Sequence, residues 1–265
     1  VAFAPTIQSL GGLTYLSSFS RDCPMGLGYS YADVIAGLYG ALAVLAALEY
    51  RNRTDQGQHI DLSEYEAICT LIGPTLLDVF ANSRDILPQG NRSPYLPVAP
   101  YGCYKCRGGD RWCVIAVFDD DEWKALCRAM GSPRWVEEKR FSTILDRKKH
   151  VEELDELLEK WTAKRTAEDV VEILQKAGVP AGIVQNAQDL ANDPHLSARR
   201  AFVHLEHPAL GDTVTDAYPM KLDDSQRDNW KAAPSLGEDN AYVCKELLGL
   251  TEAEFSSYVE EGIIG

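Results

Sequence analysis

The most reactive arrangement in the sequence is a carboxylate at the start of a long apolar stretch. Asp33 comes directly before residues 34–48, which include no charged side chain. A carboxylate at the N-terminus of a helix lies near unpaired backbone N–H groups and the positive end of the helix dipole, which keep it ionised at neutral pH. Such a carboxylate can act as a nucleophile, and the nearby amides can stabilise oxyanions. The simpler interpretation is that Asp33 only caps the helix, a common role that contributes about 0.5–2 kcal/mol to stability.

A second candidate site lies in the proline-rich residues 88–100, which carry four prolines. Such a stretch is extended and typical of a connector between structural units, so we predict a domain boundary near residue 90. Asn91 and Arg92 stand inside it. The guanidinium of Arg92 could bind an acyl carboxylate or a phosphate with two parallel hydrogen bonds. A solvated loop arginine is the alternative.

The cysteines do not form a metal-site pattern. Cys103-x-x-Cys106 with Cys113 could supply three zinc ligands across a hairpin, but a closed structural site needs four, and no second C-x-x-C or paired histidine lies nearby. The pair precedes a Gly-Gly turn instead of a helix, which opposes a thioredoxin-like redox role. We therefore predict no metal, and small core residues at Cys113 and Cys127.

The residues around Asp33 predict the elements that must position it. From residue 33 to about 53, apolar residues lie around the whole helical circumference with Ala and Gly between them, which predicts a long helix enclosed on most sides. Residues 1–32 are rich in Gly, Ser, Tyr and Pro and predict loops. Beyond the helix, residues 59–62 predict a short strand. Ser63 then begins a helix to about residue 82, with Glu66 at the capping-box position.

The remainder of the chain predicts a small α+β unit and a return to mixed structure. Two apolar runs around a Gly-Gly turn indicate a β-hairpin, and later segments have the pattern of amphipathic helices and short strands. The predicted hairpin strands are 101–106 and 112–118, the helices 119–130, 149–163, 166–177, 240–248 and 252–261, and the other strands 181–184, 202–205 and 213–215.

Composition limits the classes of partner. The chain has 265 residues, a net charge of −14 and a pI of about 4.8, which oppose binding to nucleic acid or to an anionic membrane. The charge-free apolar run has fifteen residues, short of the roughly 20 that a spanning helix needs, so we predict no membrane segment. The seven cysteines are odd in number and scattered, which favours reduced thiols in a cytoplasm.

Several segments in order resemble the family III coenzyme A transferases. They begin with Ala32-Asp33 and the small-residue helix, and they extend over essentially the entire chain. The similar segments are residues 46–58 (AALEYRNRTDQGQ), 60–63 (IDLS), 90–94 (GNRSP), 99–104 (APYGCY), 177–182 (AGVPAG), 193–196 (DPHL) and 236–240 (LGEDN). The family includes formyl-CoA, carnitine-CoA and benzylsuccinate-CoA transferases and the related α-methylacyl-CoA racemases. Each segment alone is weak, but their order and spacing are specific.

The resemblance implies an α/β fold in three parts. Residues 1–90 would be a portion of a large α/β domain with the catalytic Asp33, residues 91–190 a smaller α+β domain inserted in it, and residues 191–265 a return to the large domain with C-terminal helices. It also implies an interlocked homodimer, or a heterodimer with a related subunit. Coenzyme A and its thioesters would be substrates, and no cofactor would be permanently bound.

The resemblance implies transfer of coenzyme A between a thioester and a free acid. Asp33 would attack the acyl-CoA carbonyl to give a mixed anhydride, the thiolate would return to form an aspartyl thioester, and the acceptor acid would then attack it. The family residues that supply most contacts to coenzyme A would precede Val1, so the chain resembles a C-terminal portion. A further departure is Asp55, where the family usually has Gly in a turn; Asp tolerates left-handed dihedral angles.

Three functions stay open at this point. The first is a transferase, the second is a 2-methylacyl-CoA racemase whose partner histidine would lie upstream, and the third is a non-catalytic subunit of a hetero-oligomeric transferase. The sequence leaves open whether this portion is active alone, and it does not identify the acyl donor or the acceptor.

Overall fold

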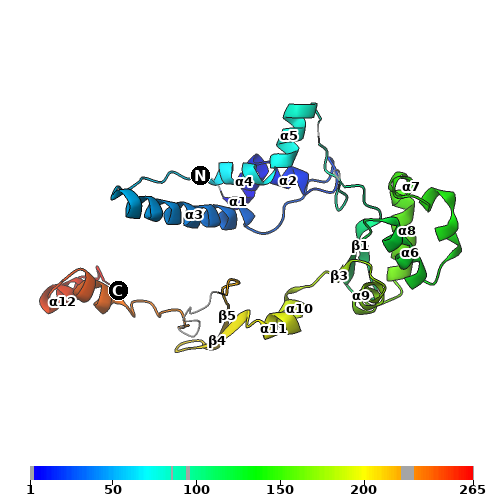
Figure 1. Cartoon of the computed structure of the whole chain (residues 1–265). Coiled ribbons are helices and arrows are strands. Elements are labelled where there is room, and N and C mark those ends of the chain that lie inside the picture. Colours follow the sequence, from blue (N-terminus) through cyan, green and yellow to red (C-terminus); the bar gives the residue numbers. More distant parts are fainter. Residues whose placement is uncertain (1–2, 85, 94–95, 222–229, 265) are drawn as a thin grey trace. The chain divides into compact units, whose positions relative to one another are not determined.

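The computed structural model describes residues 3–84, 86–93, 96–221 and 230–264 (Figure 1). Pro94, part of one family-like segment, lies outside the described residues. Contacts divide the chain into two compact units, residues 1–184 and 185–265. The predicted three-part division with boundaries at 90 and 190 stays a prediction. The content is mixed helix and sheet, as predicted.

The first 32 residues are more regular than predicted. Helix α1 spans Ala4–Leu10 and α2 spans Leu13–Leu16, joined at Gly12, which takes a left-handed φ of 80°. The prediction of loops was wrong. Pro5 stands in the first turn of α1, and apolar side chains pack α1 against the start of the long helix that begins at Tyr31. Ala4, Ala32 and Ile68 form this small core with Ile7 and Leu13 beside it.

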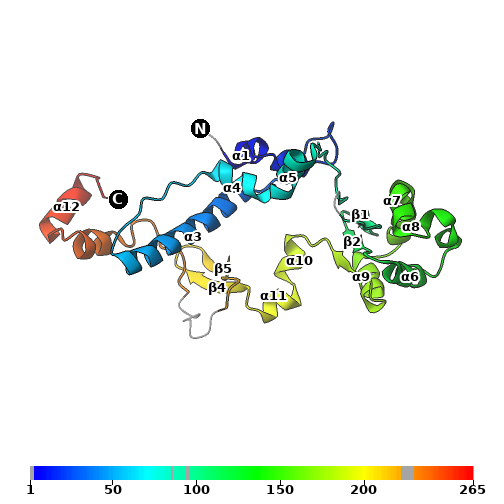
Figure 2. The ribbon, with the colours of Figure 1, turned by 45° about the horizontal axis from the view of Figure 1, so that its top comes forward.

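The long apolar helix is confirmed as α3, Tyr31–Thr54. It ends at Asp55, whose φ of 58° is left-handed, so the turn forms without the family's usual glycine. The predicted enclosure was wrong within this chain: Leu38, Leu42 and Leu45 are 62–64% exposed. In both views, α1 and α4 lie beside the N-terminal end of α3 and the remainder of the helix extends away from them (Figure 1, Figure 2). Apolar residues on every side of a helix predict burial. The surface that covers such a helix comes from tertiary or quaternary contacts, which the helical pattern does not specify.

By length and composition alone, α3 could cross a membrane. Its best 18-residue window has a mean hydropathy of 1.8. A core helix of a water-soluble protein meets the same criterion, and the charge-free portion is the fifteen residues 34–48. The helix therefore needs apolar surroundings, and its composition does not say which kind.

The second predicted helix is divided in two. Helix α4 spans Glu64–Leu71 and begins at Ser63, whose Oγ accepts a hydrogen bond from the Glu66 N–H at 3.2 Å, as predicted. Helix α5 spans Gly73–Asn82, because Gly73-Pro74 interrupts the run at Ile72. The predicted strand at residues 59–62 was wrong: this segment is irregular, and a strand requires a partner ladder that no neighbouring segment among the described residues provides.

Residues 101–183 form a three-stranded antiparallel sheet with helices packed on one face. The strands are β1 (Tyr101–Lys105), β2 (Trp112–Ala116) and β3 (Ala181–Ile183), in the order β1-β2-β3. The predicted hairpin is confirmed, with Cys103 opposite Val114. The helices are α6 (Asp120–Ala129), α7 (Ile144–Lys149), α8 (Val151–Thr162) and α9 (Ala167–Lys176), with 3-10 turns at Arg134–Glu137 and Lys139–Phe141.

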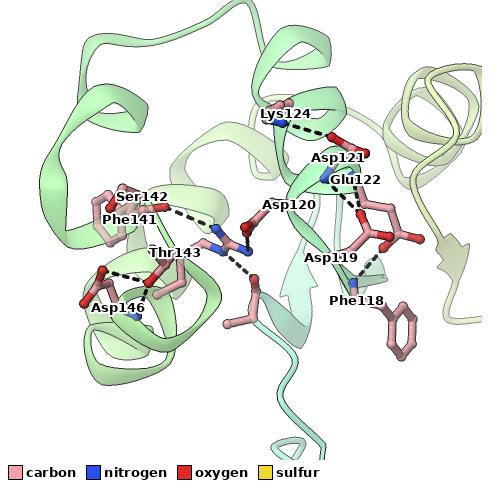
Figure 3. Close-up of polar contacts among 12 residues, drawn as sticks. Phe118, Asp119, Asp120, Asp121, Glu122, Lys124, Phe141, Ser142, Thr143 and Asp146 are labelled. Atoms are coloured by element: carbon pink, nitrogen blue, oxygen red, sulfur yellow. Dashed lines mark hydrogen bonds and ion pairs between the residues drawn. The ribbon is translucent and has the colours of Figure 1, made fainter.

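The core of this sheet-and-helix layer is apolar and contains one arginine. Leu126, Leu154, Leu158 and Leu174 are fully buried in it. Arg147 is also fully buried, and its guanidinium donates hydrogen bonds to the carbonyls of Ala99 (2.9 Å) and Phe141 (3.3 Å) and to Asp120 (2.9 Å). Figure 3 shows Asp120 and Phe141 reaching this guanidinium from two sides. It joins the proline-rich segment to α6 and to the turn before α7.

The second unit contains a two-stranded sheet and short helices. Strands β4 (Phe202–His207) and β5 (Gly211–Asp216) include the predicted strand residues 202–205 and 213–215, and they pair in an antiparallel hairpin. The short helices are α10 (Ala187–Ala191) and α11 (Pro194–Ala198), followed later by α12 (Glu252–Glu260). The predicted helix at 240–248 is a π-helical segment, Tyr242–Leu247.

Candidate active site

Asp33 lies on the first turn of α3, in the third position of the helix. It is therefore not the cap: Ser30 occupies that position, and the capping interpretation was wrong. The side chain of Asp33 is exposed, whereas its neighbour Ala32 is fully buried. The Ala32 N–H donates a hydrogen bond to Oε1 of the buried Gln8 at 3.2 Å, so α1 holds the first turn of α3 in place. The result is an anchored helix start that presents an exposed carboxylate.

A second carboxyl group lies beside Asp33. Glu64 is the first residue of α4, and its Oε1 is buried with no hydrogen-bond partner among the described residues. Burial, followed by a hydrogen bond with the Asp33 side chain and the negative charge of Asp33, raises the pKa of Glu64 above 4.5. Two ionised carboxylates only accept hydrogen bonds and repel each other, so their contact becomes favourable when one of them carries a proton. The raised pKa means that Glu64 takes up a proton at a higher pH than an isolated glutamate does.

Asn91 and Arg92 line a groove on the open face of the sheet. The groove has a volume of about 820 Å³ and is bounded by residues 90–93, by β1 and β2, and by residues 180–182. A second groove of about 510 Å³ shares Asn91 and Arg92 and adds the carboxylates of Asp155, Glu156 and Glu159. The structure thus brings these two predicted binding residues together. Asp33 is not among the residues that line either groove.

Acidic neighbours hold the Arg92 side chain loosely. Its guanidinium nitrogens lie 3.5 Å from Oε1 of Glu152 and 3.8 Å from Oδ2 of Asp155, and the side chain is 41% exposed. Asp155 also accepts a hydrogen bond from the hydroxyl of Tyr104 at 2.8 Å. Burial raises the pKa of Asp155, against the opposing effects of Tyr104 and Arg92. The guanidinium is oriented yet retains donors that can reach a ligand.

The segment before β1 is tied to the N-terminal helices by its backbone. The Gly90 N–H donates to the Ser18 carbonyl at 3.3 Å, and Gly90 takes a left-handed φ of 60°. A Cβ on Gly90 would lie 3.1 Å from the ring of Phe19, so a side chain there would be crowded as well as strained. Gly90 therefore allows the close approach that places Asn91 and Arg92 at the groove.

The C-x-x-C pair belongs to the sheet and not to a reactive centre. All seven cysteines are free thiols. Burial raises the pKa of the Cys103, Cys106 and Cys113 thiols, which keeps them protonated, the opposite of a reactive cysteine. Cys113 and Cys127 are buried core residues, as predicted. The described part of the chain holds no cluster of three or more His, Cys, Asp or Glu side chains suited to a metal ion.

Sequence reasoning missed Gln8 and Glu64. Gln8 falls in a segment interpreted as loops, and Glu64 is one of two acidic residues that follow a helix cap, an arrangement that usually only complements the helix dipole. No local pattern distinguishes Glu64 from Glu66. Only the packing of α4 against α3 does.

Comparison with known proteins first defines the class. A CaiB/BaiF family protein from Brucella suis shares the fold with a TM-score of 0.84 at 27% identity, over 93% of this chain and 63% of that one. The chain is thus a mixed α/β protein of the CaiB/BaiF type. The description of the matching family, over residues 1–240, is CoA-transferase family III, and the chain belongs to this family.

Curated relatives are CoA-transferases. The chain is 30% identical to the succinyl-CoA–D-citramalate CoA-transferase of Chloroflexus aurantiacus, over 97% of this chain and 63% of the relative. It is 27% identical to the β subunit of succinyl-CoA–L-malate CoA-transferase of the same organism, over 99% of this chain and 65% of the relative. The chain therefore spans somewhat less than two thirds of the length of these relatives.

Proposed function

We propose that the protein transfers coenzyme A from an acyl-CoA thioester to a free carboxylic acid, with Asp33 as the acyl carrier. The observation that supports this most is the exposed carboxylate of Asp33 on a helix start anchored through Ala32 and Gln8, in a chain of CoA-transferase family III. An ionised carboxylate is the form that attacks a carbonyl carbon.

The proposed reaction has four covalent steps. An oxygen of Asp33 attacks the thioester carbonyl, the C–S bond breaks, and coenzyme A thiolate leaves a mixed anhydride. The thiolate attacks the Asp33 carbonyl carbon and releases the donor acid, which leaves an aspartyl thioester. The acceptor carboxylate attacks this thioester and releases the thiolate from a new anhydride. The thiolate then attacks the acceptor's acyl carbon and restores Asp33.

Chemical trapping tests the proposal. The full protein, including whatever its gene encodes before residue 1, is incubated with succinyl-CoA and then with hydroxylamine, which converts an activated aspartyl group to a hydroxamate. We expect peptide mass spectrometry to find the hydroxamate on Asp33 only when the thioester is present. A racemase or a non-catalytic subunit would form no such species, so its absence across a panel of acyl-CoA thioesters would refute the proposal.

We propose that Arg92 and Asn91 bind the carboxylate of the acid. The acidic neighbours Asp155, Glu156 and Glu159 make a polyphosphate a poor occupant of this groove, whereas one carboxylate matches the guanidinium fork. For Arg92→Ala we expect the KM for the acid to rise about tenfold, because one charge-assisted hydrogen bond to the acid is lost. The kcat should stay within about threefold of the wild-type value. Steady-state kinetics with the acid as the varied substrate measures this.

Arg107→Ala is the matched control for Arg92. Arg107 is also exposed, at 62%, and has a loose ion pair with Asp169 at 3.9 Å, but it does not line the groove. The Arg107→Ala variant should have the same KM for the acid as the wild type. Equal kinetic constants for both variants would remove Arg92 from the binding site.

We propose that α3 is covered in the assembled protein, by a second subunit or by further residues of the same polypeptide. We also propose that the protein works in the cytoplasm. The exposed leucines of α3 support a covering partner, since neighbouring exposed apolar side chains are typical of interaction surfaces. A partner subunit would be either a second copy or a related chain; the β-subunit relative supports the latter.

A further inference from the structure

Two helices of the first unit pack against each other, and each carries a carboxyl group on its first turn. Asp33 is on the first turn of α3 and Glu64 is the first residue of α4, and these helices pack against each other and against α1. Ile68, one turn after Glu64 on the same face of α4, is fully buried against Ala32 and Ala4. The packing therefore directs Glu64 toward the start of α3.

One oxygen of the half-buried Glu64 carboxyl lacks the partners that normally stabilise a buried carboxylate. Its Oε1 is buried without a hydrogen-bond partner among the described residues, a costly arrangement for an ionised oxygen. The cost is smaller when the carboxyl is a neutral acid, whose other oxygen can donate a proton to a neighbour. The side chain that contacts it is Asp33, an obligatory acceptor when ionised.

We propose that Glu64 is a positioning residue for Asp33: its neutral carboxyl donates a hydrogen bond to one oxygen of the Asp33 carboxylate and leaves the other oxygen free to attack. The inference rests on the proposed function for its kinetic consequences, but the pairing of the two groups can be measured without any substrate.

The hydrogen bond serves each step without moving a proton. While Asp33 attacks the thioester through its free oxygen, Glu64 keeps the other oxygen in place. When thiolate or the acceptor acid then attacks the Asp33 carbonyl carbon, negative charge develops on the oxygen that Glu64 contacts. The same donor stabilises that oxyanion, and the proton stays on Glu64 throughout. Removing one such donor costs about 10²-fold or more in known enzymes.

The pH dependence follows from the direction of the shift in the Glu64 pKa. Below this raised pKa, Glu64 is neutral and donates; above it, Glu64 is ionised, repels Asp33 and donates nothing. Transfer therefore declines as pH rises through the Glu64 pKa. Besides the pair itself, the first turns of α3 and α4 carry the titratable residues Tyr31, Tyr65 and Glu66, and α1 carries none.

Two substitutions of Glu64 separate the donor from the charge. Glu64→Gln retains an N–H donor that does not titrate, and we expect kcat within about threefold of the wild type with the alkaline decline removed. Glu64→Leu fills the same space without a donor, and we expect kcat to fall about 30-fold with KM within about threefold. Denaturant midpoints of both variants verify that they fold. Unchanged kcat and pH profile in Glu64→Leu would overturn the role.

A substrate-free measurement decides the pairing itself. Carbon-13 NMR of the glutamate side-chain carboxyls, assigned with Glu64→Gln, should show a pKa of Glu64 above 4.5. In Asp33→Asn the negative neighbour is gone, so the pKa of Glu64 should be lower than in the wild type. Titration of Glu64 at the same pH in both proteins would overturn the inference even if CoA transfer is active. Absence of the trapped Asp33 species would instead overturn the proposed function and leave the NMR result to decide the pairing.

Discussion

Replacement of Asp33 by asparagine should reduce CoA transfer by about 10³-fold or more, the scale seen when a covalent nucleophile is removed. The amide is nearly the same size as the carboxylate and is exposed at this position, so the folded structure should change little. It cannot form the anhydride or the aspartyl thioester, because its nitrogen and oxygen are poor nucleophiles. Chromatography of the CoA esters over time, from succinyl-CoA and a panel of acids, measures the rate.

Glu66→Gln is the matched control for Asp33→Asn. Glu66 is also an exposed carboxylate at the third position of a helix, α4, in the same unit. Its loss should leave the rate within about twofold and the unfolding free energy within about 0.5 kcal/mol. If Asp33→Asn transferred CoA as fast as Glu66→Gln, Asp33 would not be the acyl carrier.

Replacement of Arg147 by methionine should lower the free energy of unfolding by about 3 kcal/mol. This is the largest stability loss that we expect from the substitutions considered. Methionine fills much of the volume, but the carbonyls of Ala99 and Phe141, both in fully buried residues, lose their donor. An unsatisfied buried carbonyl costs about 1–3 kcal/mol. The ion pair itself contributes less, because Asp120 is 55% exposed and becomes hydrated when released.

Urea denaturation followed by tryptophan fluorescence measures this loss. Trp123 is a suitable reporter, since the Arg147 guanidinium carbon lies 4.7 Å from its ring centroid and Trp135 is 6.4 Å away, ring to ring. Arg140→Met is the matched control: Arg140 also lies over an aromatic ring, Phe141, and contacts Glu138 and Glu153, but it is 37% exposed. We expect its cost to stay below about 1 kcal/mol. Equal losses in the two variants would contradict the role assigned to the buried carbonyls.

Local patterns were sufficient for most elements of residues 101–183. The Gly-Gly hairpin and the helix predicted at residues 166–177 depend on residues close in sequence, and the structure has both. Local patterns failed at residues 59–62, because a strand depends on a partner, and at residues 1–32, where the contacts that hold α1 come from residues 32 and 68.

By itself, the sequence determined that a long apolar helix follows Asp33, that a turn forms at Asp55 and that the chain resembles family III. Each depends on near neighbours or on the order of short segments along the chain. Only the tertiary structure decided that Ser30 precedes the helix and Asp33 stands within it, that Gln8 anchors its first turn, and that Glu64 meets Asp33. The physical reason is that a carboxyl group gains or loses its charge through the atoms that surround it. For Asp33 and Glu64, those atoms come from different helices.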